Sequence, residues 1–100
     1  MIDITTHPSH NLLWDHYCGP AKDRAAAIHY IRNEISTLRS LGAALNLTKN
    51  FSRLVKVDKL LEELSLFLYA LQGIPYLNDG QEPPAYRYAE HRAATFWPDE

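Results

Sequence analysis

The fold of this chain is decided by two stretches of sequence, AKDRAAAIHYIRNEISTLRSLGAAL (residues 21–45) and LVKVDKLLEELSLFLYAL (residues 54–71). Neither stretch contains proline, and apolar residues recur in each with spacings of three and four, which is the period of one face of an α-helix. The pattern therefore predicts two amphipathic helices. Their apolar faces consist of Ile28, Ile31, Ile35, Leu38, Gly42 and Leu45 in the first, and Leu54, Val57, Leu61, Leu64, Leu68 and Leu71 in the second.

Short polar or turn-forming segments bound these two helices. Gly19-Pro20 precedes the first, and a proline suits the first helical turn because its missing N–H is not needed there. Gly73 follows the second and is suited to a helix end. Residues 46–50 leave only a short link between the helices, so we expect an antiparallel hairpin.

Two details of the link are open to prediction. Thr48 is a suitable N-cap for the second helix, but Asp58 could begin that helix instead if residues 49–57 are irregular. Gly42 occupies a seam position where a large residue is expected. Its small size predicts that the two backbones approach closely near the turn.

The second helix is apolar beyond its seam, at Leu60, Leu66, Phe67 and Tyr69, so one partner helix cannot cover it. Two further segments can supply cover. Ser9 can cap a short helix that carries Trp14 and Tyr17, and Pro84 can start a helix that places Tyr86, Ala89, Ala93 and Phe96 or Trp97 along one side.

The predicted fold class is therefore all-α: a long antiparallel helical hairpin with a short N-terminal helix and a C-terminal helix or extended tail packed on it. One hundred residues form one domain. Within it we expect a loose N-terminus over residues 1–8 and a proline- and aromatic-rich C-terminal segment over residues 74–100.

The composition excludes several classes of protein. Ten basic and twelve acidic residues give a net charge of -2, which argues against a dedicated nucleic-acid-binding protein. The single cysteine cannot form an internal disulfide. The first ten residues lack the apolar core of a secretory signal, and the longest apolar stretch, Leu64 to Leu71, is too short to span a bilayer. We expect a cytoplasmic protein without membrane contact.

Charge is nevertheless distributed unevenly along the chain. Residues 20–59 contain eight basic and three acidic residues. On a helical hairpin, a basic patch is expected near the turn, formed by Arg39, Lys49, Arg53, Lys56 and Lys59. Such a patch can contact nucleic-acid phosphates or an acidic protein surface. The alternative is an ordinary solvated helix face, which the net charge of the whole chain favours.

The N-terminal region collects residue types that can bind a metal ion, namely His7, His10, His16 and Cys18. No histidine pair has the helical i, i+4 spacing and no second cysteine is present, so a metal site is only an alternative. Cys18 with a neighbouring histidine could act as a nucleophile, but no oxyanion-stabilising partner can be named, and a buried apolar role is favoured. We expect no enzymatic activity and no cofactor.

The C-terminal segment suggests contacts with other proteins. Pro83-Pro84-Ala85-Tyr86 matches the PPxY pattern that WW domains bind, although a helix starting at Pro84 explains the same residues. Its prolines could also be sites for a prolyl isomerase. Large apolar side chains often anchor interfaces, and the candidates here are Tyr76, Tyr86, Tyr88, Phe96 and Trp97, with Leu66 and Phe67 on the hairpin.

These observations favour a small non-enzymatic protein-interaction module, such as an inhibitor, an adaptor or an assembly subunit. Its partner is expected to be another protein or a second copy of the chain, the latter giving a four-helix dimer. Two alternatives remain open: a nucleic-acid-associated regulator that uses the basic patch, and a metal-binding protein that uses the N-terminal histidines and Cys18.

Overall fold

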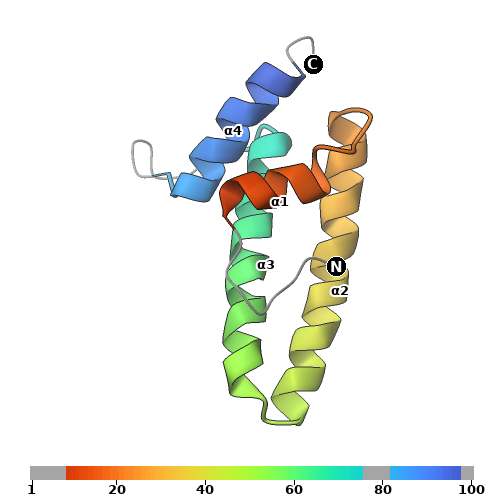
Figure 1. Ribbon diagram of the computed structural model, residues 1–100, viewed down its shortest axis with the longest axis vertical. Coiled ribbons are helices and arrows are strands. Elements are labelled where there is room, and N and C mark those ends of the chain that lie inside the picture. The colour runs from red at the N-terminus through yellow and green to blue at the C-terminus, as the bar shows by residue number, and fades with distance from the viewer. Residues whose placement is uncertain (1–8, 76–81, 98–100) are drawn as a thin grey trace.

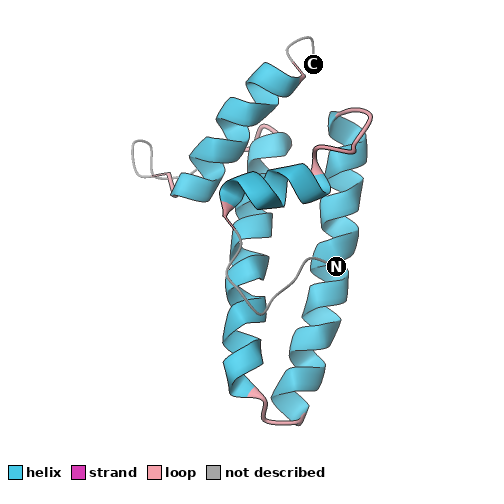
Figure 2. Cartoon of the chain, in the orientation of Figure 1, coloured by secondary structure: helices cyan, strands magenta, loops and turns pink. Residues whose placement is uncertain are grey.

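The computed structural model describes residues 9–75 and 82–97, and this part of the chain is helical without strands. Its helices are α1 (His10–Tyr17), α2 (Arg24–Leu47), α3 (Phe51–Leu71) and α4 (Pro84–Phe96). Helices α2 and α3 form a long antiparallel hairpin (Figures 1 and 2). Helices α1 and α4 pack at the end of the hairpin that lies away from its turn. The all-α prediction is confirmed.

The helix starts follow from local capping. Ser9 accepts a hydrogen bond from the Leu12 N–H at 3.3 Å, so it caps α1 as predicted. Helix α4 begins at Pro84, also as predicted. The predicted start of α2 was too early, because Asp23 is its N-cap and accepts from the Ala26 N–H at 2.8 Å. Pro20 therefore lies in the preceding loop.

The prediction that Thr48 caps the second helix was wrong. Thr48 ends α2, and its hydroxyl donates to the carbonyls of Ala44 at 3.1 Å and Leu45 at 3.2 Å. The alternative start at Asp58 was also wrong, because that residue lies within α3. Helix α3 begins at Phe51 after Asn50, whose side chain makes no capping hydrogen bond.

Both long helices end in a residue with positive φ. Gly73, with φ of 73°, follows α3 as predicted, and the Ile74 N–H donates to the Tyr69 carbonyl at 3.0 Å. At the end of α2 the same geometry is adopted by Lys49, with φ of 59°. Glycine is the usual residue at such a position, so a lysine there is strained.

The core runs along the hairpin between α2 and α3. The α2 seam is confirmed from Ile31 to Leu45, while Ile28 is only partly buried. On α3 the buried row differs from the predicted seam. Leu61 and Leu68 are partly buried, whereas the off-seam Leu60 and Phe67 are fully covered. The reason is that α3 packs against α4 as well as α2, so its buried surface is wider than one seam.

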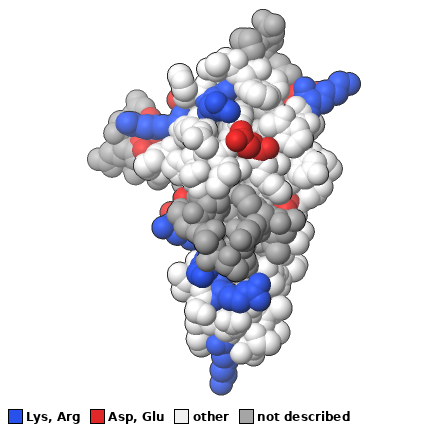
Figure 3. All heavy atoms as spheres, viewed as in Figure 1, with Lys and Arg blue, Asp and Glu red and all other residues white. Residues whose placement is uncertain are grey.

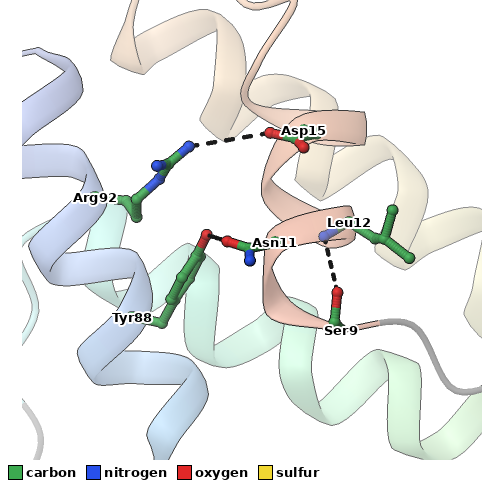
Figure 4. Close-up of polar contacts among 6 residues, drawn as sticks. All are labelled: Ser9, Asn11, Leu12, Asp15, Tyr88 and Arg92. Atoms are coloured by element: carbon green, nitrogen blue, oxygen red, sulfur yellow. Dashed lines mark hydrogen bonds and ion pairs between the residues drawn. The ribbon is translucent and has the colours of Figure 1, made fainter.

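Aromatic side chains join α1 and α4 to the hairpin. The buried ring of Trp14 lies 6.3 Å from that of Phe67 and 5.6 Å from that of Trp97, measured between ring centroids. The guanidinium of Arg92 stacks over the Trp14 ring at 5.5 Å and approaches the Asp15 carboxylate at 4.0 Å (Figure 4). These contacts fix the two short helices on one end of the hairpin.

Hydrogen bonds from two tyrosines of α4 support the same arrangement. The Tyr88 hydroxyl donates to the side-chain oxygen of Asn11 on α1 (Figure 4). The Tyr86 hydroxyl donates to the Ile74 carbonyl at 2.7 Å, which ties α4 to the end of α3.

Gly42 is buried against α3, as predicted, but the contact does not require glycine. A Cβ atom at this position would lie 3.6 Å from the Leu54 Cδ1 and 3.8 Å from the Val57 Cγ1. These are ordinary van der Waals distances to side-chain methyl groups. The prediction of a close backbone approach is therefore corrected: the space at Gly42 can hold an alanine.

Candidate functional site

The five side chains of the predicted basic patch are all exposed. Lys49 lies in the turn before α3, whereas Arg53, Lys56 and Lys59 lie on α3. Arg39 lines a groove between α2 and α3, and Lys59 lines a different groove together with His10 and Glu63. The joint action of these cations as one patch stays a prediction.

Exposed apolar side chains accompany the cations at the turn. Leu47 at the end of α2 is 84% exposed, Phe51 at the start of α3 is 55% exposed, and Val55 is 66% exposed. Phe51 and Val55 lie one turn apart on the same side of α3. We call the turn end of the hairpin, which carries the exposed residues Leu47, Lys49, Phe51, Arg53 and Val55, the hairpin tip.

Basic residues outnumber acidic ones near the hairpin tip. Residues 39–58 contain Arg39, Lys49, Arg53 and Lys56 and one acidic residue, Asp58, which is exposed one helical turn beyond Val55 on α3. On the face shown in Figure 3, the turn end of the molecule carries blue side chains and no red ones. The hairpin tip therefore carries exposed apolar side chains and mostly positive charge.

A second candidate site is the groove between α2 and α3, which has a volume of about 240 Å³. Four of its lining residues come from one side of α2, and three come from the facing side of α3. We call it the arginine groove, and it is lined by Arg32, Ile35, Ser36, Arg39, Ser65, Leu68 and Tyr69.

Sequence reasoning missed the apolar part of the hairpin tip and all of the arginine groove except Arg39. A signal was present for both. Phe51 and Val55 are spaced by four outside the predicted seam of the second helix, and Leu47 lies outside the seam of the first, among basic residues. Arg32, Ser36 and Arg39 have the spacing of one helix face.

Most of the predicted partner-binding aromatic residues are used inside the chain. Phe67, Tyr86 and Trp97 are buried, so they are not available to a partner in this structure. Leu66 and Tyr88 are partly buried, and Phe96 is exposed but packs its ring against Trp14 and Trp97. Tyr76 lies outside the described residues. Of the off-seam apolar residues of α3, Leu60 and Phe67 are buried within the chain itself, Leu66 is partly buried and Tyr69 remains exposed.

The same burial applies to the PPxY pattern. Pro84 opens α4, and Tyr86 is buried with its hydroxyl bonded to the Ile74 carbonyl. WW domains bind this pattern as an extended segment. The structure presents it instead as the first turn of a helix.

The structure does not bring the candidate metal and nucleophile residues together. Burial raises the pKa of Cys18 to about 12, and the nearby charge of Arg92 opposes this only in part. His16 is exposed against the Tyr17 ring, and His10 lies 3.6 Å from the Glu63 carboxylate. His7 lies outside the described residues. Within residues 9–75 and 82–97, no three histidine, cysteine or acidic side chains are grouped as metal ligands. A thiol protonated at neutral pH is a poor nucleophile.

Comparison with models of protein families, with curated proteins and with solved structures finds no match to this chain. Over the described residues, the helices are too short or too polar to cross a membrane. The assignment of function therefore depends on the hairpin tip and the arginine groove themselves.

Proposed function

We propose that this chain is a non-enzymatic protein-interaction module, such as an inhibitor, an adaptor or an assembly subunit, and that it contacts its partner through the hairpin tip. The observation that carries the proposal is the exposure of Leu47, Phe51 and Val55 at one end of a packed hairpin. Large apolar side chains exposed at one end of a small folded domain are candidates for a contact surface.

The charge around these side chains indicates the chemistry of the partner. Protein interfaces commonly have an apolar centre and a polar border. Near the hairpin tip basic residues outnumber acidic ones, since residues 39–58 contain four basic residues and one acidic residue, Asp58. The complementary partner is a protein surface with an apolar depression and acidic residues around it.

Lys49 gives this proposal a second support. It holds a left-handed backbone conformation, with φ of 59°, that glycine adopts without strain. The cost for a residue with a side chain is about 1 kcal/mol. A positive charge is thus kept at the turn at the expense of stability, as is expected where the charge has a function.

Three other occupants of the hairpin tip fit less well. Two tips of identical chains would bring like charges together. A bilayer would be held weakly, since even one myristoyl chain attaches a protein only marginally. Nucleic acid would place the three apolar side chains against a charged sugar-phosphate surface.

The non-enzymatic and cytoplasmic parts of the proposal have their own support. Cys18, the one nucleophile candidate of the N-terminal region, is buried and protonated at neutral pH. Cys18 is also a free thiol, and a protein with a lone thiol does not depend on an oxidising compartment.

Site-specific crosslinking tests the proposal. A photoreactive phenylalanine analogue is placed at Val55 in the full chain in its native host, and a control chain carries it at Tyr30, which is also exposed but lies in the second turn of α2, far from the hairpin turn. Proteins captured only from position 55 are then purified and titrated against the chain. The proposal predicts that binding is weakened at least about tenfold by Leu47→Ser with Phe51→Ser, and that it weakens with salt.

The control variant carries Leu12→Ser with Tyr30→Ser, two exposed apolar positions away from the tip, and it should bind normally. Equal weakening by tip and control substitutions would contradict the proposal. So would tip-dependent binding to phosphatidylserine vesicles, to a 20-base-pair DNA duplex or to a second copy of the chain in place of the captured protein.

A further inference from the structure

The arginine groove is lined by two arginines of α2 and by polar residues of the facing helix α3. Arg32 and Arg39 lie two helical turns apart on α2, which separates their backbones by about 10 Å. Both side chains line the same 240 Å³ groove, so both guanidinium groups can reach one ligand between them. Ser65 and Tyr69 line the groove from α3, one turn apart on the facing helix.

The charge of the groove is unbalanced. Within residues 9–75 and 82–97, neither Arg32 nor Arg39 makes an ion pair or a hydrogen bond. Arg24, Arg87 and Arg92 are engaged, since Arg24 donates to the Leu71 carbonyl, Arg87 pairs with Glu82 and Arg92 approaches Asp15, whereas Arg53 at the hairpin tip resembles the groove arginines in lacking such a contact within the described residues. Neighbouring acidic residues of α3, Glu62 and Glu63, line the separate groove that contains His10. The lining of the arginine groove thus carries two positive charges and no negative charge.

The groove also offers hydroxyl groups and an apolar surface. Ser36, Ser65 and Tyr69 each supply a hydroxyl, and none of the three bonds to another side chain or carbonyl of the described residues. Ile35 and Leu68 are apolar lining residues, and the ring of Tyr69 is exposed beside them. A ligand with an anionic end and a flat apolar part would contact both surfaces.

We infer that the arginine groove binds a small organic phosphate monoester. A phosphate dianion presents three oxygens, which two guanidinium groups and nearby hydroxyls can bind through charge-assisted hydrogen bonds. The organic part of the ligand lies on Leu68 and Tyr69. This site is separate from the hairpin tip, so it is a second function and does not depend on the proposed protein contact.

Calorimetric titration of the full chain with phenyl phosphate tests the inference. Inorganic phosphate serves as a probe without an apolar part, and phenol serves as a probe without charge. The expected order of affinity is phenyl phosphate, then inorganic phosphate at least about threefold weaker, with no measurable binding of phenol. Amide resonances of Ser36 and Ser65 should shift on titration, while that of Val55 at the hairpin tip should not.

Substitution of the arginines distinguishes binding at the arginine groove from nonspecific attraction of phosphate to basic side chains. Arg32→Gln and Arg39→Gln should each weaken phenyl phosphate at least about tenfold, because each removes a charge-assisted contact. Arg53→Gln removes the same charge at the hairpin tip and should leave the affinity unchanged. All three side chains are exposed, so the variants are expected to fold, and circular dichroism verifies this.

Three outcomes would overturn the inference. The first is the absence of phenyl phosphate binding to the folded protein. The second is equal weakening by Arg53→Gln and by the groove substitutions, which would indicate nonspecific attraction. The third is equal affinity for inorganic phosphate and phenyl phosphate, which would show that the groove does not recognise the organic part of the ligand.

Discussion

Replacement of Gly42 by alanine should stabilise the protein, and this prediction tests the register of the hairpin. Gly42 lies within α2 and is buried against α3. If the helices are as close as the structure shows, an added Cβ meets only the methyl groups of Leu54 and Val57, at 3.6 and 3.8 Å. The new methyl group then fills space without displacing its neighbours.

Two contributions determine the size of the effect. Alanine is more favourable than glycine in a helix interior by about 1 kcal/mol. Burial of one methyl group adds up to about 0.8 kcal/mol. We therefore expect Gly42→Ala to raise the free energy of unfolding by about 1–2 kcal/mol. For a chain of this length, that corresponds to a rise in Tm of at least about 4 °C.

Urea unfolding followed by circular dichroism measures this change, and two other glycines serve as controls. Gly73→Ala should destabilise by about 1 kcal/mol, because φ at this position is 73°. Gly19→Ala should also destabilise, because its Cβ would lie 2.7 Å from the Asp15 carbonyl oxygen. A loss of stability in Gly42→Ala would refute the reasoning, since it would mean that the helices approach more closely or in another register.

Three further predictions concern the packing of the core. Phe67→Ala should lower the free energy of unfolding by about 3–5 kcal/mol in urea, because it opens a cavity beside Trp14. Phe51→Ala at the exposed hairpin tip is the control and should change the free energy of unfolding by less than about 0.5 kcal/mol. Equal effects of the two substitutions would contradict the assignment of the core. Tyr86→Phe should cost about 1 kcal/mol through loss of the hydrogen bond to the Ile74 carbonyl, and Tyr30→Phe, an exposed control, should have no effect. Burial raises the pKa of Cys18 to about 12 from the ordinary 9.0, so the unfolded chain loses this proton first as pH rises. Stability should therefore fall between pH 9 and pH 12, by about 1 kcal/mol at pH 10. Cys18→Ala should show a smaller decline over the same range, and an unchanged pH profile would argue against a buried thiol.

Local sequence signals predicted the helices because their causes are local. The spacing of apolar residues located α2 and α3, and Ser9, Pro84 and Gly73 marked helix ends correctly. The errors at Thr48 and Pro20 have one cause. Several residues near each boundary could serve as a cap, and the choice depends on which hydrogen bonds the folded backbone leaves unfilled.

Long-range packing could not be predicted in the same way. The sequence showed that α3 had more apolar surface than one helix could cover and predicted that the N- and C-terminal segments would cover it, but not which aromatic side chains that packing would bury. For this reason Phe67, Tyr86 and Trp97 were assigned to a partner, whereas the structure buries them in the chain's own core. Once those residues are enclosed, Leu47, Phe51 and Val55 form the exposed apolar group at the turn, and the arginine groove exists only because α2 and α3 lie side by side.

The central claim is that the hairpin tip is the contact surface for another protein, and methyl-group NMR tests it most directly. The chain is labelled at its leucine and valine methyl groups and titrated with the protein captured by crosslinking at position 55. The claim predicts that the signals of Leu47 and Val55 shift or broaden first, while that of Leu12 on α1, which is 57% exposed, stays unchanged. Changes centred on Leu12 and the α1–α4 end, with Leu47 and Val55 unaffected, would contradict it.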